Sequence, residues 1–292
     1  MTPQVRIERY SEALAERLEN PAAAPAPGEV VLYWLGQAGF IIDLPGYRVL
    51  LDPYLSDSLA RKYAGTAFPH RRMMAAPIVP EELLRLDLVL CTHRHTDHMD
   101  PDTLQALAVR FPRLPFVVPA ASIDEARKRC GVPDRRLIPV NAGDSVEVLP
   151  GFRVRPVPSA HETLTIDAQH QHEWLGYVID VAGVRLYHSG DCIPYPALAA
   201  TLASLSPQVA LLPVNGRDQD RSGNGVPGNF TLDEAIALCH EVNIPVMVAH
   251  HYGMFDFNTV EPQVIDARAS LESSPQFEAH RAQQAWAMRL LA

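Results

Sequence analysis

The stretch at residues 86–101, "LDLVLCTHRHTDHMDP", decides how the rest of the chain is interpreted. An apolar run with the length of a buried strand comes first, and His93, His95, Asp97 and His98 follow it within six positions. The chain has 12 histidines in 292 residues, so three in so short a span is far above chance. Imidazole and carboxylate groups gathered directly after a strand predict a site at the rim of a sheet.

The spacing inside this stretch separates the ligands into two sets. Residues two apart in an extended chain point to the same side, so His93 and His95 can bind one ion. Asp97 and His98 are adjacent, where the chain turns toward the next helix, and would more naturally serve a second ion. Imidazole nitrogen and carboxylate oxygen suit zinc, manganese or iron. No cysteine lies in the cluster, so a closed structural cysteine site is not supported.

Other histidines and aspartates also follow apolar runs farther along the chain. They are Asp52, His161, Asp191 and the pair His250 and His251. Strand ends present side chains at one rim of a sheet, so these residues extend the candidate site. His250 and His251 differ in strand parity, and both cannot point into the site from a regular strand.

The order of elements predicts the fold class. Residues 5–20 have apolar positions near helical spacing and are expected to form an amphipathic helix, followed by a proline-rich linker. Residues 1–29 are therefore assigned to an N-terminal helix and linker, and residues 30–292 to one catalytic-type domain. That domain runs β-rich, α, β-rich, α, with a terminal helix expected over 279–291. Two such halves packed sheet to sheet make an α/β, four-layer αββα sandwich.

Charge and cysteine usage limit the class of partner. The formal net charge of -9 disfavours nucleic acid as a partner. Four scattered cysteines without a C-x-x-C spacing are typical of reduced thiols in the cytoplasm. The N-terminus lacks the apolar core of a signal peptide, and no apolar run approaches the roughly 18 residues that span a bilayer. We expect a cytoplasmic protein with a small-molecule substrate and no membrane partner. The sequence leaves open whether the chain forms a homo-oligomer.

At this point the motifs resemble a known family. "THRHTDH" resembles the H-x-H-x-D-H motif of the metallo-β-lactamase superfamily, and "LLDP", "SAH", "YHSGD" and "HHYGMF" follow the expected order around it. The resemblance runs from about residue 30 to 260. Within the superfamily, "WLGQAGF", "APIVPEELLRLDLVLCTH" and "PVNGRD" are similar to the L-ascorbate-6-phosphate lactonase branch. Related phosphodiesterases and phospholipases share part of this pattern.

The resemblance implies a role for each matched residue. One metal would be held by His93, His95 and His161, and the other by Asp97, His98 and His251, with Asp191 bridging the two. His251 is favoured over His250 because the late histidine of the family directly precedes residues like Tyr-Gly. Asp52 would orient a ligand histidine, as metal-bound imidazoles usually require.

The same resemblance implies the chemistry. One or two divalent ions, manganese or zinc with iron also compatible, would lower the pKa of a shared water and supply hydroxide. Asp97 would relay a proton and Asp191 would complete the catalytic pair. The expected enzyme is a metal-dependent hydrolase that opens a lactone on a small anionic, phosphorylated sugar. The alternatives are a metal-dependent phosphodiesterase and a non-catalytic metal-binding or sensing protein.

Four polar residues are predicted to bind the anionic part of the substrate. Asn215 and Arg217 belong to "NGRD", which follows an apolar run, and Arg71 and Arg72 belong to the loop "RRMM". Arginine can hold a phosphate with two parallel hydrogen bonds. The alternatives are a salt bridge of Arg217 that pins the following glycine-rich loop, and a surface loop at Arg71 and Arg72.

Overall fold

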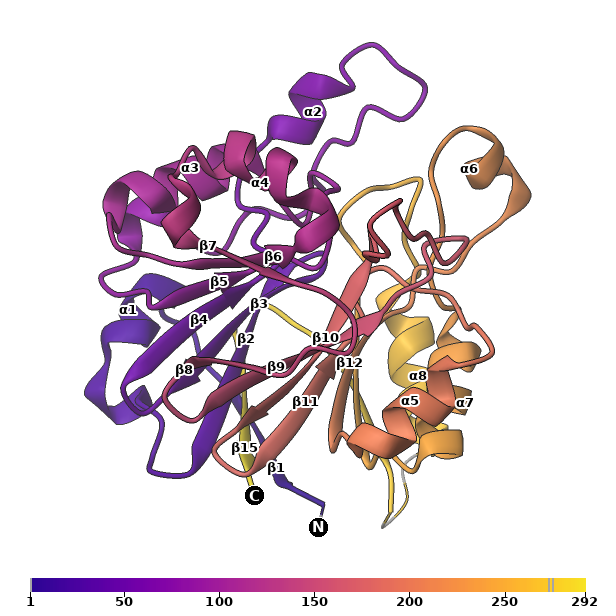
Figure 1. The fold of residues 1–292 in the computed structure, drawn as a ribbon. Helices are drawn as coiled ribbons and strands as arrows, with labels where there is room; N and C mark the ends of the chain where they lie inside the picture. Colours follow the sequence, from indigo (N-terminus) through magenta and orange to yellow (C-terminus); the bar gives the residue numbers. More distant parts are fainter. Residues whose placement is uncertain (1, 273, 275) are drawn as a thin grey trace.

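In the computed structural model, which describes residues 2–272, 274 and 276–292, two β-sheets pack face to face and helices cover the outer face of each (Figure 1). This arrangement confirms the predicted four-layer αββα sandwich.

The first sheet combines the N-terminal half of the chain with the last strand. Its order is β1-β15-β2-β3-β4-β5-β6-β7, with parallel pairing from β4 to β7 and antiparallel pairing elsewhere. The strands are β1 Gln4–Arg9, β2 Glu29–Gly36, β3 Gly39–Leu44, β4 Tyr47–Leu51, β5 Leu88–Leu90, β6 Phe116–Pro119, β7 Leu137–Val140 and β15 Trp286–Leu291.

The second sheet holds the remaining strands. Its order is β14-β13-β12-β11-β10-β9-β8, parallel from β11 to β14 and antiparallel from β8 to β11. The strands are β8 Val146–Leu149, β9 Phe152–Pro158, β10 Leu175–Val181, β11 Val184–His188, β12 Val209–Pro213, β13 Val246–His250 and β14 Glu278–Arg281.

The helices divide between the two outer faces and one rim. The first sheet is covered by α1 Leu14–Glu19, α3 Pro101–Arg110 and α4 Ile123–Cys130, and the second by α5 Leu198–Leu205, α7 Leu232–Val242 and α8 Pro262–Glu272. Two short helices, α2 Ser58–Lys62 and α6 Gln219–Gly223, stand at the upper rim in Figure 1. Short 3-10 helices occupy Pro21–Ala23, Pro80–Glu82, Ala120–Ser122 and Asp134–Arg136. No helix in the described part of the chain has the length and apolar character needed to span a bilayer.

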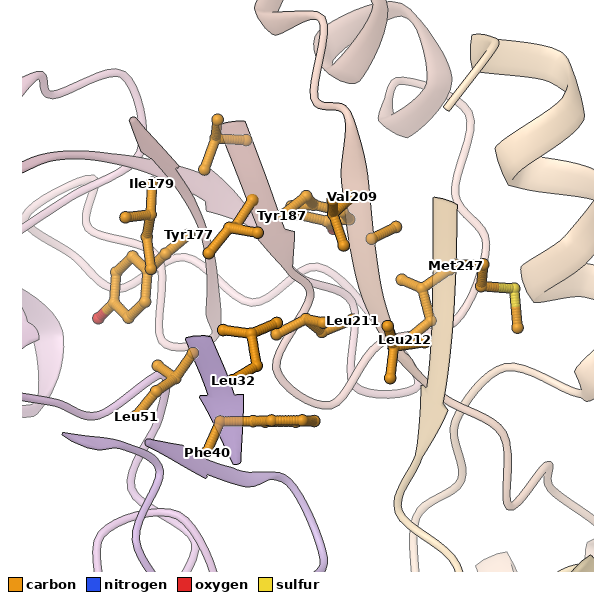
Figure 2. Packing of buried hydrophobic residues seen from close by; sticks show 14 of the residues in the cluster. Leu32, Phe40, Leu51, Tyr177, Ile179, Tyr187, Val209, Leu211, Leu212 and Met247 are labelled. Carbon is orange, nitrogen blue, oxygen red and sulfur yellow. The ribbon is translucent and has the colours of Figure 1, made fainter. Parts of the chain in front are cut away.

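Apolar residues at successive positions allow a strand to pack on both of its faces, against the other sheet and against the helices. In β2, Leu32 and Trp34 face the second sheet, whereas Val31, Tyr33 and Leu35 face the helices α1 and α3. Figure 2 shows part of one buried cluster, in which Leu32, Phe40 and Leu51 of the first sheet pack together with residues of the second sheet such as Tyr177 and Leu211. Burial of each side chain of this size stabilises the fold by about 1.5–3 kcal/mol relative to leaving it exposed.

The predicted start of the helix that follows the histidine motif is confirmed. Asp100 caps α3, because its side chain accepts a hydrogen bond from the Thr103 amide, and Pro101 occupies the first helical position. The motif is thereby held between the end of β5 and the start of α3.

The helix predicted for residues 5–20 is wrong in its first half. Only α1, from Leu14 to Glu19, is helical, and residues 4–9 form β1, paired antiparallel with β15. Val5 and Ile7 pack on the core at a spacing of two, and this strand period was mistaken for part of a helical one. Arg289 of β15 also donates to Glu8, which fixes β1 at the edge. Residues 1–29 thus contribute a strand and a helix, and the boundary at residue 29 stays a prediction.

The terminal helix predicted for residues 279–291 is also wrong. This segment contains the end of β14 and all of β15, and β15 inserts between β1 and β2. Met288 and Leu290 face one layer of the core and Ala287 faces the other, as in a strand. Alanine, methionine and leucine favour helix locally, but tertiary pairing overrides that preference.

Candidate metal centre

The polar residues singled out in the sequence gather at one rim of the sandwich. Each follows a strand: Asp52 follows β4, the histidine motif follows β5, His161 follows β9, Asp191 follows β11 and His251 follows β13. Backbone contacts join the two sheets here, since the Leu175 amide donates to the Thr92 carbonyl at 3.1 Å. The site therefore spans the seam between the sheets.

Seven side chains form two adjacent groups whose potential ligand atoms lie within 4.8 Å of one another in each group. The first ligand group is His93, His95, His161 and Asp191, and the second ligand group is Asp97, His98 and His251. These are the seven residues that the sequence proposed as ligands.

Asp191 faces both ligand groups. Its Oδ1 lies 3.1 Å from Nε2 of His98 and 3.2 Å from Nε2 of His251, while its Oδ2 lies 3.6 Å from Nε2 of His161. Gly190, the residue before Asp191, lets the backbone pass close to Leu175 and Thr92. Its φ is +60°, and a Cβ there would lie 2.7 Å from the Leu175 carbonyl oxygen and 2.9 Å from Cβ of Thr92.

Asp52 lies beneath the motif and is fully buried. Its Oδ2 is 2.7 Å from Nδ1 of His98, and its Oδ1 and Oδ2 accept from the amide and the hydroxyl of Thr92 at 2.7 and 2.6 Å. Because the Thr92 hydroxyl donates to Asp52, its oxygen is free to accept from Nδ1 of His93, 3.0 Å away. In a neutral imidazole whose Nδ1 donates in this way, Nε2 carries the lone pair, which is the form that binds a metal.

Gln37, which the sequence analysis did not single out as a site residue, supports the second ligand group. It lies in the turn between β2 and β3 and is fully buried with a φ of +51°. Its Nε2 donates to Oδ2 of Asp97 at 2.9 Å and lies 3.1 Å from Nε2 of His251. Its backbone carbonyl accepts the His251 amide at 3.0 Å. The motif "WLGQAGF" contained this residue, but no spacing in the sequence tied it to the histidines.

The first ligand group is held mainly by ring packing. The Trp174 indole lies against His93, His95 and His161, with ring centroids 5.1, 4.9 and 5.5 Å apart. Thr92 adds the one hydroxyl contact to His93 described above. Nothing in the sequence pattern indicated a role for Trp174 or Thr92.

The two groups differ in how their surroundings affect ionisation. Burial lowers the pKa of His93 well below its usual value, lowers that of His161, and lowers that of His95 to about 4, with the neighbouring imidazoles acting in the same direction. These three imidazoles are neutral at pH 7.

His98 is shifted the other way. Burial disfavours its charge, but the carboxylates of Asp191, Asp52 and Asp97 outweigh burial and raise the pKa of His98 well above its usual value. The contacts between His98 and the carboxylates also change the pKa of the acidic partners. Burial opposes the charge of Asp191, yet His251 and His98 hold the pKa of that carboxyl well below its usual range. The second group is thus a dense cluster of charge.

The donor set fits a divalent cation. Nε2 of His93 is buried and has no hydrogen-bond partner among the described residues, and the contacts of Nε2 of His98 and Oδ1 of Asp191 are with each other and with other members of the two ligand groups. A buried polar atom without a partner is costly, and a positive ion would satisfy the Nε2 of His93 together with these neighbours. Nitrogen and oxygen donors without sulfur suit zinc, manganese or iron, as expected from the sequence.

His250 lies outside the two groups. It ends β13, is fully buried between the sheets, and stacks on His188 with ring centroids 4.9 Å apart. The backbone at His251 has a φ of +61°, which turns that side chain away from the strand direction and toward Asp191. The sequence left open whether His250 or His251 belongs to the site, and the structure places His251 there.

A pocket of about 430 Å³ opens above the two groups. Ligand-group residues form part of its lining: His95, Asp97, His161, Asp191 and His251. Three cations and four aromatic residues also line it: Lys62, Arg94 and Arg129, and Tyr63, Phe68, His70 and Phe255.

The residues predicted to bind substrate do not line this pocket. Arg217 forms an ion pair with Glu234 through two contacts of 2.6 Å, and it also donates to the Asn229 carbonyl at 3.1 Å. Asn215 is buried behind the lining, with its side chain bonded to Asn258 at 2.7 Å and to Asn229. For Arg217 the structure thus supports the alternative, a salt bridge that pins its loop.

The second predicted pair of arginines is also directed elsewhere. Arg72 donates to the backbone carbonyls of Met74, Tyr54 and Ser56, so its guanidinium ties the loop together. Arg71 is exposed outside the pocket. A charge pattern in the sequence could not reveal that these donors are already used by the backbone.

Comparison with known proteins assigns the family. A family model described as Beta-lactamase superfamily domain matches residues 47–252, which is more than half of the chain. The chain belongs to this superfamily, as the motifs predicted.

Relatives and solved structures agree with this assignment. A UPF0173 metal-dependent hydrolase of Thermoplasma acidophilum is 27% identical over 82% of this chain and 90% of its own length. Another from Myxococcus xanthus is 28% identical over 80% of this chain and 74% of its own. Igni18, a metallo hydrolase from Ignicoccus hospitalis, superposes with a TM-score of 0.64 at 21% identity, covering 88% of this chain and 96% of that one. An isothiocyanate hydrolase from Delia radicum gut bacteria has a TM-score of 0.68 at 20% identity, covering 86% and 95%. The structural matches show the shared fold.

Proposed function

We propose that this protein is a metal-dependent hydrolase that opens a lactone on a small anionic substrate, such as a phosphorylated sugar. The observation that carries the proposal is the pair of adjacent ligand groups, facing Asp191 from both sides, at the floor of a pocket lined by three cations. The relatives named metal-dependent hydrolase support the reaction class. The resemblance of the sequence to the ascorbate-6-phosphate lactonase branch supports the lactone.

The two ligand groups would hold one or two divalent ions, and Asp191 would serve both. Manganese and zinc are the proposed metals, with iron also compatible with the donors. When bound, such an ion activates a water at neutral pH and polarises the oxygen that becomes negative. Asp52 and Thr92 keep the histidine nitrogens aimed at the site, so the ligand geometry exists before substrate arrives.

Asp97 is the residue placed to handle a proton. Burial opposes its charge, but His98 and His251 hold the pKa of the Asp97 carboxyl below its usual range, so it is ionised at pH 7. Gln37 fixes one carboxylate oxygen by donating to it, and Asp97 also lines the pocket. In hydrolysis the proton lost by water can pass to Asp97 and then to the leaving alkoxide of the opened ring.

The cations of the pocket support an anionic substrate. Arg94 pairs with Glu173, and Arg129 pairs with Glu125 and donates to the Met99 carbonyl at 3.0 Å. A guanidinium group has five N–H donors, so these contacts leave donors on each arginine for a ligand. Lys62 is exposed at the rim. Because the whole chain carries a net charge of -9, an anion needs such local cations to bind.

The proposal is tested by hydrolysis assays on chelated and reloaded protein. Purified protein is stripped with a chelator, then reloaded separately with manganese, zinc or iron. It is assayed against a phosphorylated lactone, its unphosphorylated counterpart and a chromogenic phosphodiester. We expect chelator-sensitive opening of the phosphorylated lactone. Turnover of the phosphodiester alone would replace the lactonase with the phosphodiesterase, and the absence of any turnover in metal-loaded protein would favour a sensing role.

The anion contacts are tested with a matched pair of arginines. Arg94→Gln removes a pocket cation, whereas Arg71→Gln removes an equal charge from an exposed position outside the pocket. A lost charge-assisted hydrogen bond costs about 1.5–3 kcal/mol, so Arg94→Gln should lower kcat/KM for the phosphorylated lactone by roughly 10–150-fold. The Arg71 variant should change it little, and equal losses in both variants would contradict this assignment of the pocket.

A further inference from the structure

Three buried asparagine side chains are hydrogen-bonded in a row behind the pocket. Nδ2 of Asn229 donates to Oδ1 of Asn215 at 3.1 Å, and Nδ2 of Asn215 donates to Oδ1 of Asn258 at 2.7 Å. Asn229 and Asn215 lie behind the lining, whereas Asn258 is one of the residues that line the pocket. We call Asn229, Asn215 and Asn258 the asparagine network.

The direction of each hydrogen bond in the asparagine network is fixed by two groups that can only donate. At one end the backbone amide of Cys192, the residue after Asp191, donates to Oδ1 of Asn229 at 2.8 Å. At the other end Nη1 of Arg221 donates to Oδ1 of Asn258 at 2.7 Å. A backbone N–H and a guanidinium group have no acceptor, so the side-chain atoms that face them must be oxygens. Exchanging oxygen and nitrogen in any of the three amides would bring two donors or two acceptors face to face.

Arg221 is itself held against Asn258. Its Nε donates to Oδ2 of Asp218 at 2.6 Å, and its Nη1 also donates to the Asn215 carbonyl at 3.1 Å. The guanidinium group therefore keeps a positive charge beside Oδ1 of Asn258. Hydrogen bonds polarise one another, so a charge on the oxygen side makes the N–H groups of the same amide stronger donors.

The amide nitrogen of Asn258 is left for a ligand. Oδ1 of Asn258 accepts two hydrogen bonds, which uses both of its lone pairs. Nδ2 has no hydrogen-bond partner in the part of the chain that the structure describes, yet this atom is not sealed from solvent. Asn258 is only 8% exposed, and it lines the pocket together with Asp97, Asp191 and His251. A donor held so deeply without a partner is costly, and an acceptor on a bound ligand would satisfy it.

From this geometry we propose that Asn258 is a substrate-binding residue, whose Nδ2 donates to an acceptor oxygen of the anionic substrate. Because the asparagine network prevents the amide from turning over, this position takes an oxygen of an ester, carboxylate or phosphate group and disfavours an N–H group. The proposal rests on the proposed hydrolase function and adds to it a neutral contact of fixed direction. Asn215, which the sequence predicted to bind substrate, would contribute by orienting Asn258.

The proposal is tested by calorimetric binding of methylphosphonate to the metal-loaded protein. As a dianion, this probe offers acceptor oxygens and no donor. In Asn258→Asp, one carboxylate oxygen can still accept from Asn215 and Arg221, but the other replaces the Nδ2 donor with an acceptor. We expect Asn258→Asp and Asn258→Ala each to weaken methylphosphonate binding by roughly 10–150-fold, the range for loss of a hydrogen bond to a charged group.

Asn224→Asp is the matched control for the added charge. It makes the same substitution at another residue that lines the pocket, and Nδ2 of Asn224 already donates to the Asp220 carbonyl at 2.7 Å. A negative charge on this lining without loss of an available donor should weaken methylphosphonate binding by about threefold or less.

Thermal unfolding separates substrate binding from a structural role. A residue that only held its loop together would tolerate aspartate, which keeps both acceptor contacts, and would lose binding only as Asn258→Ala. We expect Asn258→Asp to unfold near the temperature of the unmodified protein and still to lose binding. Affinity of Asn258→Asp within about threefold of Asn224→Asp overturns the proposal, and so does the absence of methylphosphonate binding by the unmodified protein.

Asn258→Ala decides the question where Asn258→Asp does not fold. Its metal content, measured by elemental analysis, should equal that of the unmodified protein while methylphosphonate binding falls, and unchanged binding overturns the proposal. Calorimetry needs no turnover, so failure of the hydrolase proposal would appear separately, in the chelator assays.

Discussion

The two ligand groups lie side by side but are supported by different physical means. Around the second group, polar partners orient the ligands. Asp52 bonds His98, and Gln37 bonds Asp97 and holds the backbone of His251. Around the first group, the Trp174 indole packs against all three imidazoles, and one hydroxyl reaches His93.

This difference indicates which ligand group depends more strongly on charge. A hydrogen bond donated to a carboxylate fixes both the orientation and the proton of an imidazole, whereas ring packing fixes only its position. The raised pKa of His98 and the lowered pKa values of the first-group histidines follow from the same contrast. We therefore expect the second group to depend on polar partners and pH, and the first to depend on packing.

The largest expected effect removes the residue that both groups share. Asp191→Ala should reduce metal content at both groups, because Asp191 lies within 3.6 Å of histidines on each side. His95→Ala should empty the first group only. Elemental analysis of purified variants measures this, and full occupancy in both variants would contradict the ligand assignment.

The next largest effect is expected when the polar support of the second ligand group is removed. Asp52→Ala should weaken metal affinity at the second group about 10–100-fold, because it removes the acceptor that orients His98. Thr92→Val is the comparison variant, since it keeps the Asp52 carboxylate that meets His98 and removes the hydroxyl that contacts His93 at 3.0 Å, Asp52 at 2.6 Å and His98 at 3.4 Å. Calorimetric titration should show the larger loss of metal affinity at the second group in Asp52→Ala and at the first group in Thr92→Val. Equal losses at both groups in both variants would contradict the difference in support.

The pH dependence should also differ between the groups. His98 has a raised pKa and is protonated near neutral pH in the metal-free chain, so a metal must displace its proton. Affinity at the second group should rise with pH, by at most about tenfold per unit for one proton. The first-group histidines have lowered pKa values, to about 4 for His95, so affinity there should be flat near neutrality.

Proton release during calorimetry in two buffers of different ionisation enthalpy measures this difference. In the metal-free chain the charged His98 stabilises the fold below the usual histidine pKa, and that contribution is lost as pH rises through the raised value. Equal proton release at both groups would show that the carboxylates around His98 do not govern its charge.

Most of this comparison could not have been made from the sequence. The four-layer fold and the seven clustered residues were predictable, because apolar strands of standard length each end in a histidine or aspartate. Gln37 and Trp174 were not predictable as site residues, since each reaches the cluster from a distant turn or strand end. For Arg72 and Arg217 the sequence could not identify the contacts, because their partners are backbone carbonyls and a glutamate on another helix.

The terminal strands illustrate the same limit. β1 and β15 lie at opposite ends of the chain and pair over six residues, from Gln4 with Leu291 to Arg9 with Trp286. Each was predicted as helix because its local residues favour helix and its partner is almost the whole chain away. Pairing of this kind is decided by tertiary contacts, which outweigh local preference.

A smaller effect is expected at Gln37. Gln37→Ala removes the amide that donates to Asp97 and lies beside His251, so affinity at the second group should fall by about three- to tenfold. Gln37→Glu places a second carboxylate next to Asp97 and should shift the pH dependence further than alanine does. Calorimetry at two pH values distinguishes the variants, and unchanged affinity in both would leave Gln37 with only its backbone role at the His251 amide.

The smallest expected effect tests the packed group. Trp174→Leu keeps an apolar side chain beside the first group but removes the flat face that meets His93, His95 and His161. An imidazole held by packing retains its ligand atom when the packing loosens, so affinity at the first group should fall only about two- to threefold, while the second group should be unchanged. Trp286→Leu, on β15 and outside the pocket, is the matched control. Titration with cobalt, whose visible absorption reports ligand geometry, should show broadened first-group bands in Trp174→Leu alone. A loss at the second group as large as that at the first would mean that the two groups share one support.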